Sequence, residues 1–95
     1  MKWWNDLWLN ESFATVMAYT CCEITKSTPA FKEMADNAWL YFSDEVSWGL
    51  RDDVLSSNHS IDAPCENNDD AENLIDGITY GKGAAVLRQL IYFVG

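Results

Sequence analysis

Two side chains have the types and surroundings in which chemistry could take place. Glu11 is a carboxylate on a segment that is otherwise mostly apolar, and Tyr80 is a phenol on the inward stripe of a helix start loosened by Gly81 and Gly83. A carboxylate accepts hydrogen bonds as an anion, whereas a phenol donates one. Spacing alone also allows a purely structural role for each of these residues. Glu11 could interact with the dipole of its own helix at the edge of a bundle, and Tyr80 could be a core tyrosine bonded to a backbone carbonyl.

The segment that carries Glu11 is predicted to be a buried helix over residues 5–24. Asn5 or Asp6 can cap its first amides, and apolar residues cover nearly every direction around its axis. At 100° per residue, the polar members fall within one sector: Glu11, Ser12 and Thr15. We expect the carboxylate to stand on a narrow polar stripe in aromatic surroundings.

Two further helices and one polar connection complete the predicted fold. A start signal at Ser27, Thr28 and Pro29 opens an amphipathic helix that we expect to end near Gly49. Residues 58–76 are rich in Asp, Glu and Asn and predict a solvated loop, with a short helical turn at Val54 and Leu55 before it. Residues 78–94 predict the last helix, with an inward stripe made of Tyr80, Ala84, Leu87, Ile91 and Val94. The fold class is therefore mainly α, with three main helices plus a long acidic loop.

Length and composition exclude several classes. The 95 residues make one domain or part of one, and a net charge of −9 disfavours nucleic acid and anionic lipid as partners. No apolar run approaches the roughly twenty residues that a membrane helix needs. The chain contains three cysteines: Cys21, Cys22 and Cys65. This odd number favours reduced thiols in a cytosol-like compartment over disulfides, and also over a metal site shared with His59. We expect His59 to be a turn residue rather than a catalyst or ligand.

Three motifs resemble one family. The segment Lys2 to Ala14, KWWNDLWLNESFA, is similar to a signature of the zinc aminopeptidases that include aminopeptidase N and the puromycin-sensitive enzyme, with Ser12 where many members have Gly. The segment Asp76 to Leu87, DGITYGKGAAVL, resembles the part of that family that carries a catalytic tyrosine. Between them, Ser56 to Ile61, SSNHSI, is similar to a family turn usually written with His-Pro, although Ser60 replaces the proline.

The resemblance implies a zinc site. It assigns Glu11 as the third zinc ligand, beside two histidines of an HExxH helix, and Tyr80 as the catalytic tyrosine that donates a hydrogen bond to the oxyanion. The implied fold is the helical part of a thermolysin-like metallopeptidase catalytic domain, and the implied substrates are peptides cleaved at their N-termini.

The family's other functional segments lie outside this sequence. The chain has one histidine and no HExxH, and it lacks the Gly-Ala-Met-Glu-Asn segment that recognises the substrate's amino group in the family. We therefore expect residues 1–95 to be a partial peptidase catalytic domain truncated at both ends. Such a chain would supply one of three zinc ligands, would need the missing remainder of its own catalytic domain as partner, and would be inactive alone.

A different class of function stays open. The chain could be a non-catalytic acidic helical module that binds another protein and derives from the same fold. Exposed aromatic surface would support this interpretation, because five tryptophans are many for so short a chain to bury: Trp3, Trp4, Trp8, Trp39 and Trp48.

Overall fold

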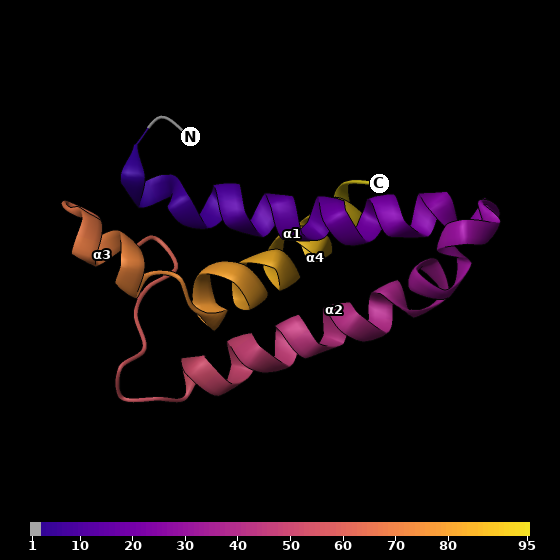
Figure 1. Cartoon of the computed structure of the whole chain (residues 1–95). Helices are drawn as coiled ribbons and strands as arrows, with labels where there is room; N and C mark the ends of the chain where they lie inside the picture. Colours follow the sequence, from indigo (N-terminus) through magenta and orange to yellow (C-terminus); the bar gives the residue numbers. More distant parts are fainter. Residues whose placement is uncertain (1–2) are drawn as a thin grey trace.

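Every regular element is helical in the computed structural model, which describes residues 3–95. The main elements in chain order are α1 (Leu7–Ile24), α2 (Lys32–Asp53), α3 (Asn68–Asn73), a π-helical turn (Ile78–Lys82) and α4 (Gly83–Val94) (Figure 1). Short 3₁₀ turns precede α1 and connect it to α2: Trp4–Asp6, Thr25–Ser27 and Pro29–Phe31. The prediction of a mainly α fold is confirmed for this part of the chain.

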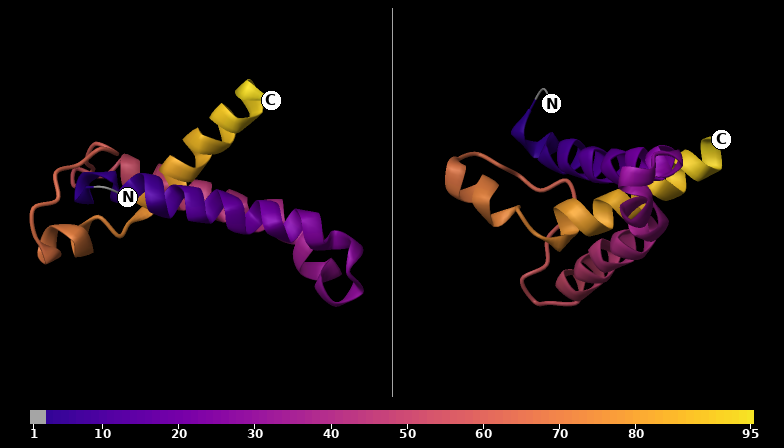
Figure 2. Two further views of the ribbon diagram at one scale, coloured as in Figure 1. Left: turned by 90° about the horizontal axis from the view of Figure 1, so that it is seen from above. Right: turned by 45° about the vertical axis from the view of Figure 1, so that its right-hand side comes forward.

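Helices α1 and α2 form a wedge that holds the last helical segment. The two are joined at one end by the 3₁₀ turns and diverge toward the other, where the π-helical turn and the start of α4 lie between them (Figure 1). The far half of α4 then leaves the other helices and projects outward (Figure 2). Of its predicted inward stripe, Ala84 and Leu87 are buried, but Ile91 and Val94 are exposed because this half contacts little of the described chain.

The core lies where the three long helices meet. Val16 of α1, Phe42 of α2, and Ala84 and Leu87 of α4 form its buried cluster. The rings of Tyr19 and Trp39 pack edge-on against Phe42, with centroids 5.4 and 5.5 Å away. Edge-to-face packing of this kind suits the ring quadrupoles and adds to the burial of apolar area.

Helix α1 differs from its prediction as a helix buried all round. Only Ser12 and Val16 are fully buried, while Leu9, Phe13 and Met17 are exposed. The reason is that the described part of the chain covers one side of α1, and this side includes the predicted polar stripe. The expected side-chain cap is also wrong, because Asp6 makes no capping hydrogen bond and the chain enters α1 through a 3₁₀ turn.

The end of α2 and the acidic loop also differ from their predictions. Helix α2 continues past Gly49 to Asp53, since Gly49 is a buried contact site and not a cap: a Cβ there would lie 2.5 Å from the backbone nitrogen of Lys82. The predicted acidic loop contains α3, whose start is capped by the Asn67 side chain accepting from the Asp70 amide at 2.9 Å. Within residues 3–95, no helix is both long and apolar enough to span a membrane.

Candidate functional site

Glu11 and Tyr80 line the same cavity. It has a volume of about 300 Å³ and lies between the start of α1, the region of α3 and the π-helical turn, with walls formed by Trp4, Leu7, Glu11, Asn68, Ala71, Glu72, Ile75 and Tyr80. Both side chains are half-buried. The fold thus brings together the two residues that the sequence singled out from opposite ends of the chain.

One hydrogen bond fixes the positions of the two site residues relative to each other. The Oγ atom of Ser12 donates to the backbone carbonyl oxygen of Thr79 at 2.6 Å, and these residues are only 0% and 1% exposed. Ser12 follows Glu11 and Thr79 precedes Tyr80, so the bond joins the two site positions across the helix interface. Gly83 permits this contact, because a Cβ there would lie 1.9 Å from the Ser12 Oγ.

Glycines let the Tyr80 segment lie directly on the α2 backbone. A Cβ at Gly81 would be 2.0 Å from the carbonyl oxygen of Glu45, and one at Gly77 would be 2.6 Å from the carbonyl oxygen of Trp48. Real Cβ atoms do not make contacts this short, so these positions accept only hydrogen. The backbone of α2 thus approaches Gly81 closely, whereas Gly83 is approached by the Ser12 side chain.

Carboxylates fix the start of the π-helical turn. The Oδ1 atom of Asp76 accepts hydrogen bonds from the amides of Ile78 and Thr79, both at 3.0 Å. The Oδ2 atom of Asp52 accepts from the Gly77 amide at 2.7 Å. These acceptors satisfy amides that have no partner within the helix, and they suit the positive end of its dipole. π-helical turns occur frequently at functional sites.

The Tyr80 phenol is held as a hydrogen-bond donor. Its ring stacks on Trp48 of α2, with centroids 6.1 Å apart and planes 27° from parallel. Burial raises the pKa of the Tyr80 hydroxyl, and the neighbouring Glu11 carboxylate raises that pKa further through hydrogen bonding and charge. A phenol with a pKa above its usual value of about 10 keeps its proton at neutral pH. Tyr80 can therefore donate to an oxygen that enters the cavity.

The Glu11 carboxylate has the donor chemistry of a zinc ligand. Asn10 donates to its Oε1 atom at 3.2 Å, and no ion pair between described residues involves Glu11. Carboxylate oxygen is one of the three ligand types that zinc takes from proteins. Residues 3–95 contain no group of three His, Cys, Asp or Glu side chains that could hold a metal by themselves. The Glu11 side chain therefore offers one oxygen donor of a type that zinc accepts.

His59 lies outside the Glu11–Tyr80 cavity but is bonded to the segment that holds Tyr80. It lines a separate cavity of about 410 Å³ together with Asp52 and Asp76. Its Nε2 atom is 2.5 Å from Asp76 Oδ2, and its Nδ1 atom is 2.7 Å from the carbonyl oxygen of Ser60. It lies in the irregular connection between α2 and α3, just after the turn at residues 56–57 and not within it, and the sequence reasoning missed its partner.

Other supporting residues were also missed. Asp76 had a visible signal, because Asp directly before a helix is a typical N-cap. Asp52 and Trp48 had none, since their roles depend on how α2 packs against the π-helical turn. The three cysteines are free thiols and contribute nothing to the cavity.

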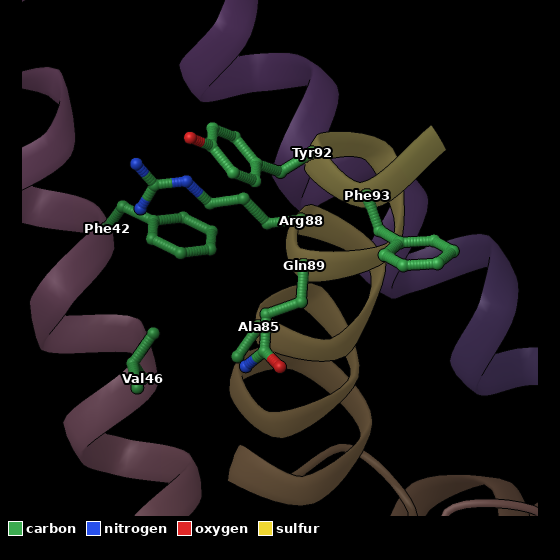
Figure 3. A pocket seen from close by; sticks show the side chains of 7 residues that line it. All are labelled: Phe42, Val46, Ala85, Arg88, Gln89, Tyr92 and Phe93. Atoms are coloured by element: carbon green, nitrogen blue, oxygen red, sulfur yellow. The ribbon is translucent and has the colours of Figure 1, made fainter. Parts of the chain in front are cut away.

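An apolar groove lies elsewhere on the molecule, between α2 and α4. It has a volume of about 850 Å³ and is lined by Phe42, Val46, Ala85, Arg88, Gln89, Tyr92 and Phe93 (Figure 3). Arg88 packs over the ring of Trp39, 3.8 Å from its centroid. Neither Glu11 nor Tyr80 reaches this groove, and none of its residues is acidic, so it is distinct from the candidate site.

The whole chain is similar in sequence to known proteins. Residues 1–95 match the family described as the peptidase family M1 domain. Aminopeptidase N of Streptomyces lividans is 45% identical over 96 aligned residues, which cover the whole chain and 11% of that protein. Tricorn protease-interacting factor F2 of Thermoplasma volcanium is 41% identical over 95 residues, and leucyl aminopeptidase of Saccharolobus solfataricus is 41% identical over 96; each alignment covers the whole chain and 11% of the relative. The chain therefore spans about a tenth of the length of these curated relatives.

Proposed function

Because this chain belongs to peptidase family M1, a zinc-dependent family, we propose that it forms part of the catalytic domain of a zinc metalloaminopeptidase of thermolysin-like fold. The protein that carries it would hydrolyse N-terminal residues from peptides. The observation that carries the proposal is the shared cavity of Glu11 and Tyr80, a potential zinc ligand and a protonated phenol on facing elements.

Glu11 is the proposed metal ligand. Its carboxylate lines the cavity without a cationic partner among the described residues, and it would complete a set with two histidines from outside this chain. His59, the single histidine of the sequence, lies in the other cavity and is already bonded to Asp76. Zinc bound in such a set polarises a carbonyl and lowers the pKa of water toward about 7.

Tyr80 is the proposed catalytic residue. Its hydroxyl would donate a hydrogen bond to the oxygen of the scissile carbonyl as negative charge develops there, and losing one such donor costs about 3 kcal/mol of transition-state stabilisation. The stacking on Trp48 and the Ser12–Thr79 bond support this role, because they fix the phenol before substrate arrives.

The isolated 95-residue chain is proposed to be inactive, because it supplies one zinc ligand of three. Purified chain should contain no stoichiometric zinc and should release no fluorophore from an aminoacyl substrate. The protein that carries the segment together with HExxH should do both. Tight one-to-one zinc together with turnover in the isolated chain would refute the proposed inactivity.

A second candidate function has one observation in its favour. Aromatic side chains are largely exposed, with Trp3 at 69%, Trp4 at 58%, Tyr92 at 91% and Phe93 at 88%. Such surface suits either contact with the remainder of a catalytic domain or an acidic module that binds another protein. A monomeric chain with a sharp, cooperative melting transition would favour the module, whereas a broad transition or aggregation would favour the catalytic part.

A further inference from the structure

We propose that His59 is a positioning residue for Tyr80, which it holds in place through Asp76. The inference rests on the proposed function of Tyr80. It concerns the turn motif Ser56 to Ile61, to which neither the zinc ligand nor the catalytic tyrosine gives a role.

Asp76 connects His59 to the Tyr80 segment because its two carboxylate oxygens have different partners. Oδ2 receives the His59 ring at 2.5 Å, while Oδ1 accepts the amides of Ile78 and Thr79 at 3.0 Å each. The backbone carbonyl of Asp76 also accepts the amide of Tyr80 at 3.1 Å. A rotation of the Asp76 carboxylate would therefore loosen the turn whose geometry aims the phenol.

His59 is itself anchored at both ring nitrogens. Its Nδ1 atom faces the Ser60 carbonyl oxygen at 2.7 Å, so the ring cannot turn away from Asp76 without losing a second bond. When both nitrogens carry protons, the imidazolium donates to both acceptors, and a charge-assisted bond holds the carboxylate more firmly than a neutral one.

The charges around His59 support the protonated form. Burial lowers the pKa of His59, but the hydrogen bonds to Ser60 and Asp76 and the Asp76 charge raise it by more, so the pKa lies above its usual 6.5. Asp52 lines the same cavity. Lys82 opposes protonation, although its Nζ atom is paired with Asp53 at 2.7 Å.

A double-mutant cycle separates positioning from a general structural role. In the zinc-loaded protein that carries this segment, His59→Ala should lower kcat by on the order of 10- to 100-fold with KM within about twofold. In a Tyr80→Phe background the same change should have little further effect, because no hydroxyl remains to be aimed. His59→Gln, which can still donate to Asp76, should recover part of the loss. Ser56→Ala, at an exposed position of the same connection and outside the His59 cavity, should match the parent.

Two outcomes of the cycle would contradict a proposal. One would overturn the role of His59, and the other would overturn the role of Tyr80. An equal loss of kcat from His59→Ala in both backgrounds would show a structural role and overturn the inference while leaving Tyr80 as the catalytic residue. Unchanged kcat in Tyr80→Phe alone would defeat the proposed role of Tyr80 and, with it, the positioning of that residue for catalysis.

A second readout needs no activity. In the whole protein that carries this segment, the ring signals of His59 can be identified by NMR as those that His59→Ala removes. Asp76→Asn keeps the amide acceptor but removes the charge, and it should lower the pKa of His59. In His59→Ala, amide hydrogen exchange at Ile78 and Thr79 should accelerate by on the order of tenfold, which is about 1.4 kcal/mol of local protection. Unchanged exchange at both amides would overturn the inference regardless of the kinetics.

Discussion

The hydroxyl of Ser12 donates a buried 2.6 Å hydrogen bond to the carbonyl oxygen of Thr79, and this bond joins α1 to the π-helical turn. The two residues are the direct neighbours of Glu11 and Tyr80. The separation between the carboxylate and the phenol therefore depends on a contact that neither of them makes.

Removing this hydroxyl should destabilise the fold measurably. Ser12→Ala leaves the buried Thr79 carbonyl without its side-chain donor, and we expect the free energy of unfolding to fall by about 1 kcal/mol. Ser47→Ala is the matched control, because Ser47 bonds a carbonyl of its own helix at an exposed site and should shift stability by less than about 0.5 kcal/mol. Urea denaturation of the whole protein that carries the segment, as parent and as the two variants, measures both values, and equal losses would contradict the interpretation.

The contact between Gly81 and α2 should tolerate no side chain. In Gly81→Ala the new methyl group would meet the Glu45 carbonyl oxygen at 2.0 Å, so one backbone must move. We expect a loss of about 2–3 kcal/mol in the free energy of unfolding. Ser43→Ala, on an exposed face of α2, is the control, and a Gly81→Ala chain as stable as this control would show that the interface is looser than described.

His59 should make stability depend on pH in a defined direction. Because its pKa is raised in the folded state, its stabilising contribution is fully present below the unfolded value of about 6.5 and is lost as pH rises through the folded value. The difference in unfolding free energy between the chain and His59→Gln should therefore be larger at about pH 6 than at about pH 8. The same difference at both pH values would exclude the ionised His59–Asp76 pair.

Tyr80→Phe should separate catalysis from zinc binding. The phenylalanine ring can keep the stacking on Trp48, so we expect the zinc content and KM of the whole protein to change little. Loss of the hydroxyl should lower kcat by on the order of 100- to 1,000-fold. Tyr41→Phe, at an exposed position of α2, should keep full activity. Steady-state kinetics of the two variants provides the comparison, and a fully active Tyr80→Phe enzyme would remove Tyr80 from the mechanism.

The helices could be predicted from the sequence because their signals are local. Pro29 marks the start of the second helical block, and the apolar spacing from Ala35 to Phe42 matches the buried face of α2. Gly49 was misread as a helix end because glycine is typical of both caps and close contacts, and only the packed structure shows the Lys82 backbone beside it. Helix α3 was missed because its residues, NDDAEN, have no apolar period.

The candidate site was predicted for a different reason. Spacing favoured neither Glu11 nor Tyr80 as functional, and the family resemblance singled them out; the structure then places both on one cavity. The supports of Tyr80 could not be predicted, because the Ser12–Thr79 and His59–Asp76 bonds join residues far apart in the sequence. Such pairings depend on the tertiary arrangement and leave no periodic signal.

Zinc content of a Glu11→Gln variant is the most direct test of the central claim, that this carboxylate is a metal ligand. The measurement is made on the whole protein that carries the segment, by elemental analysis after dialysis. The amide is a much poorer zinc ligand than the carboxylate, so we expect bound zinc to fall from one per protein to well below one. Glu72→Gln, which changes another carboxylate on the same cavity, should keep its zinc. A full complement of zinc at unchanged affinity in Glu11→Gln would contradict the account.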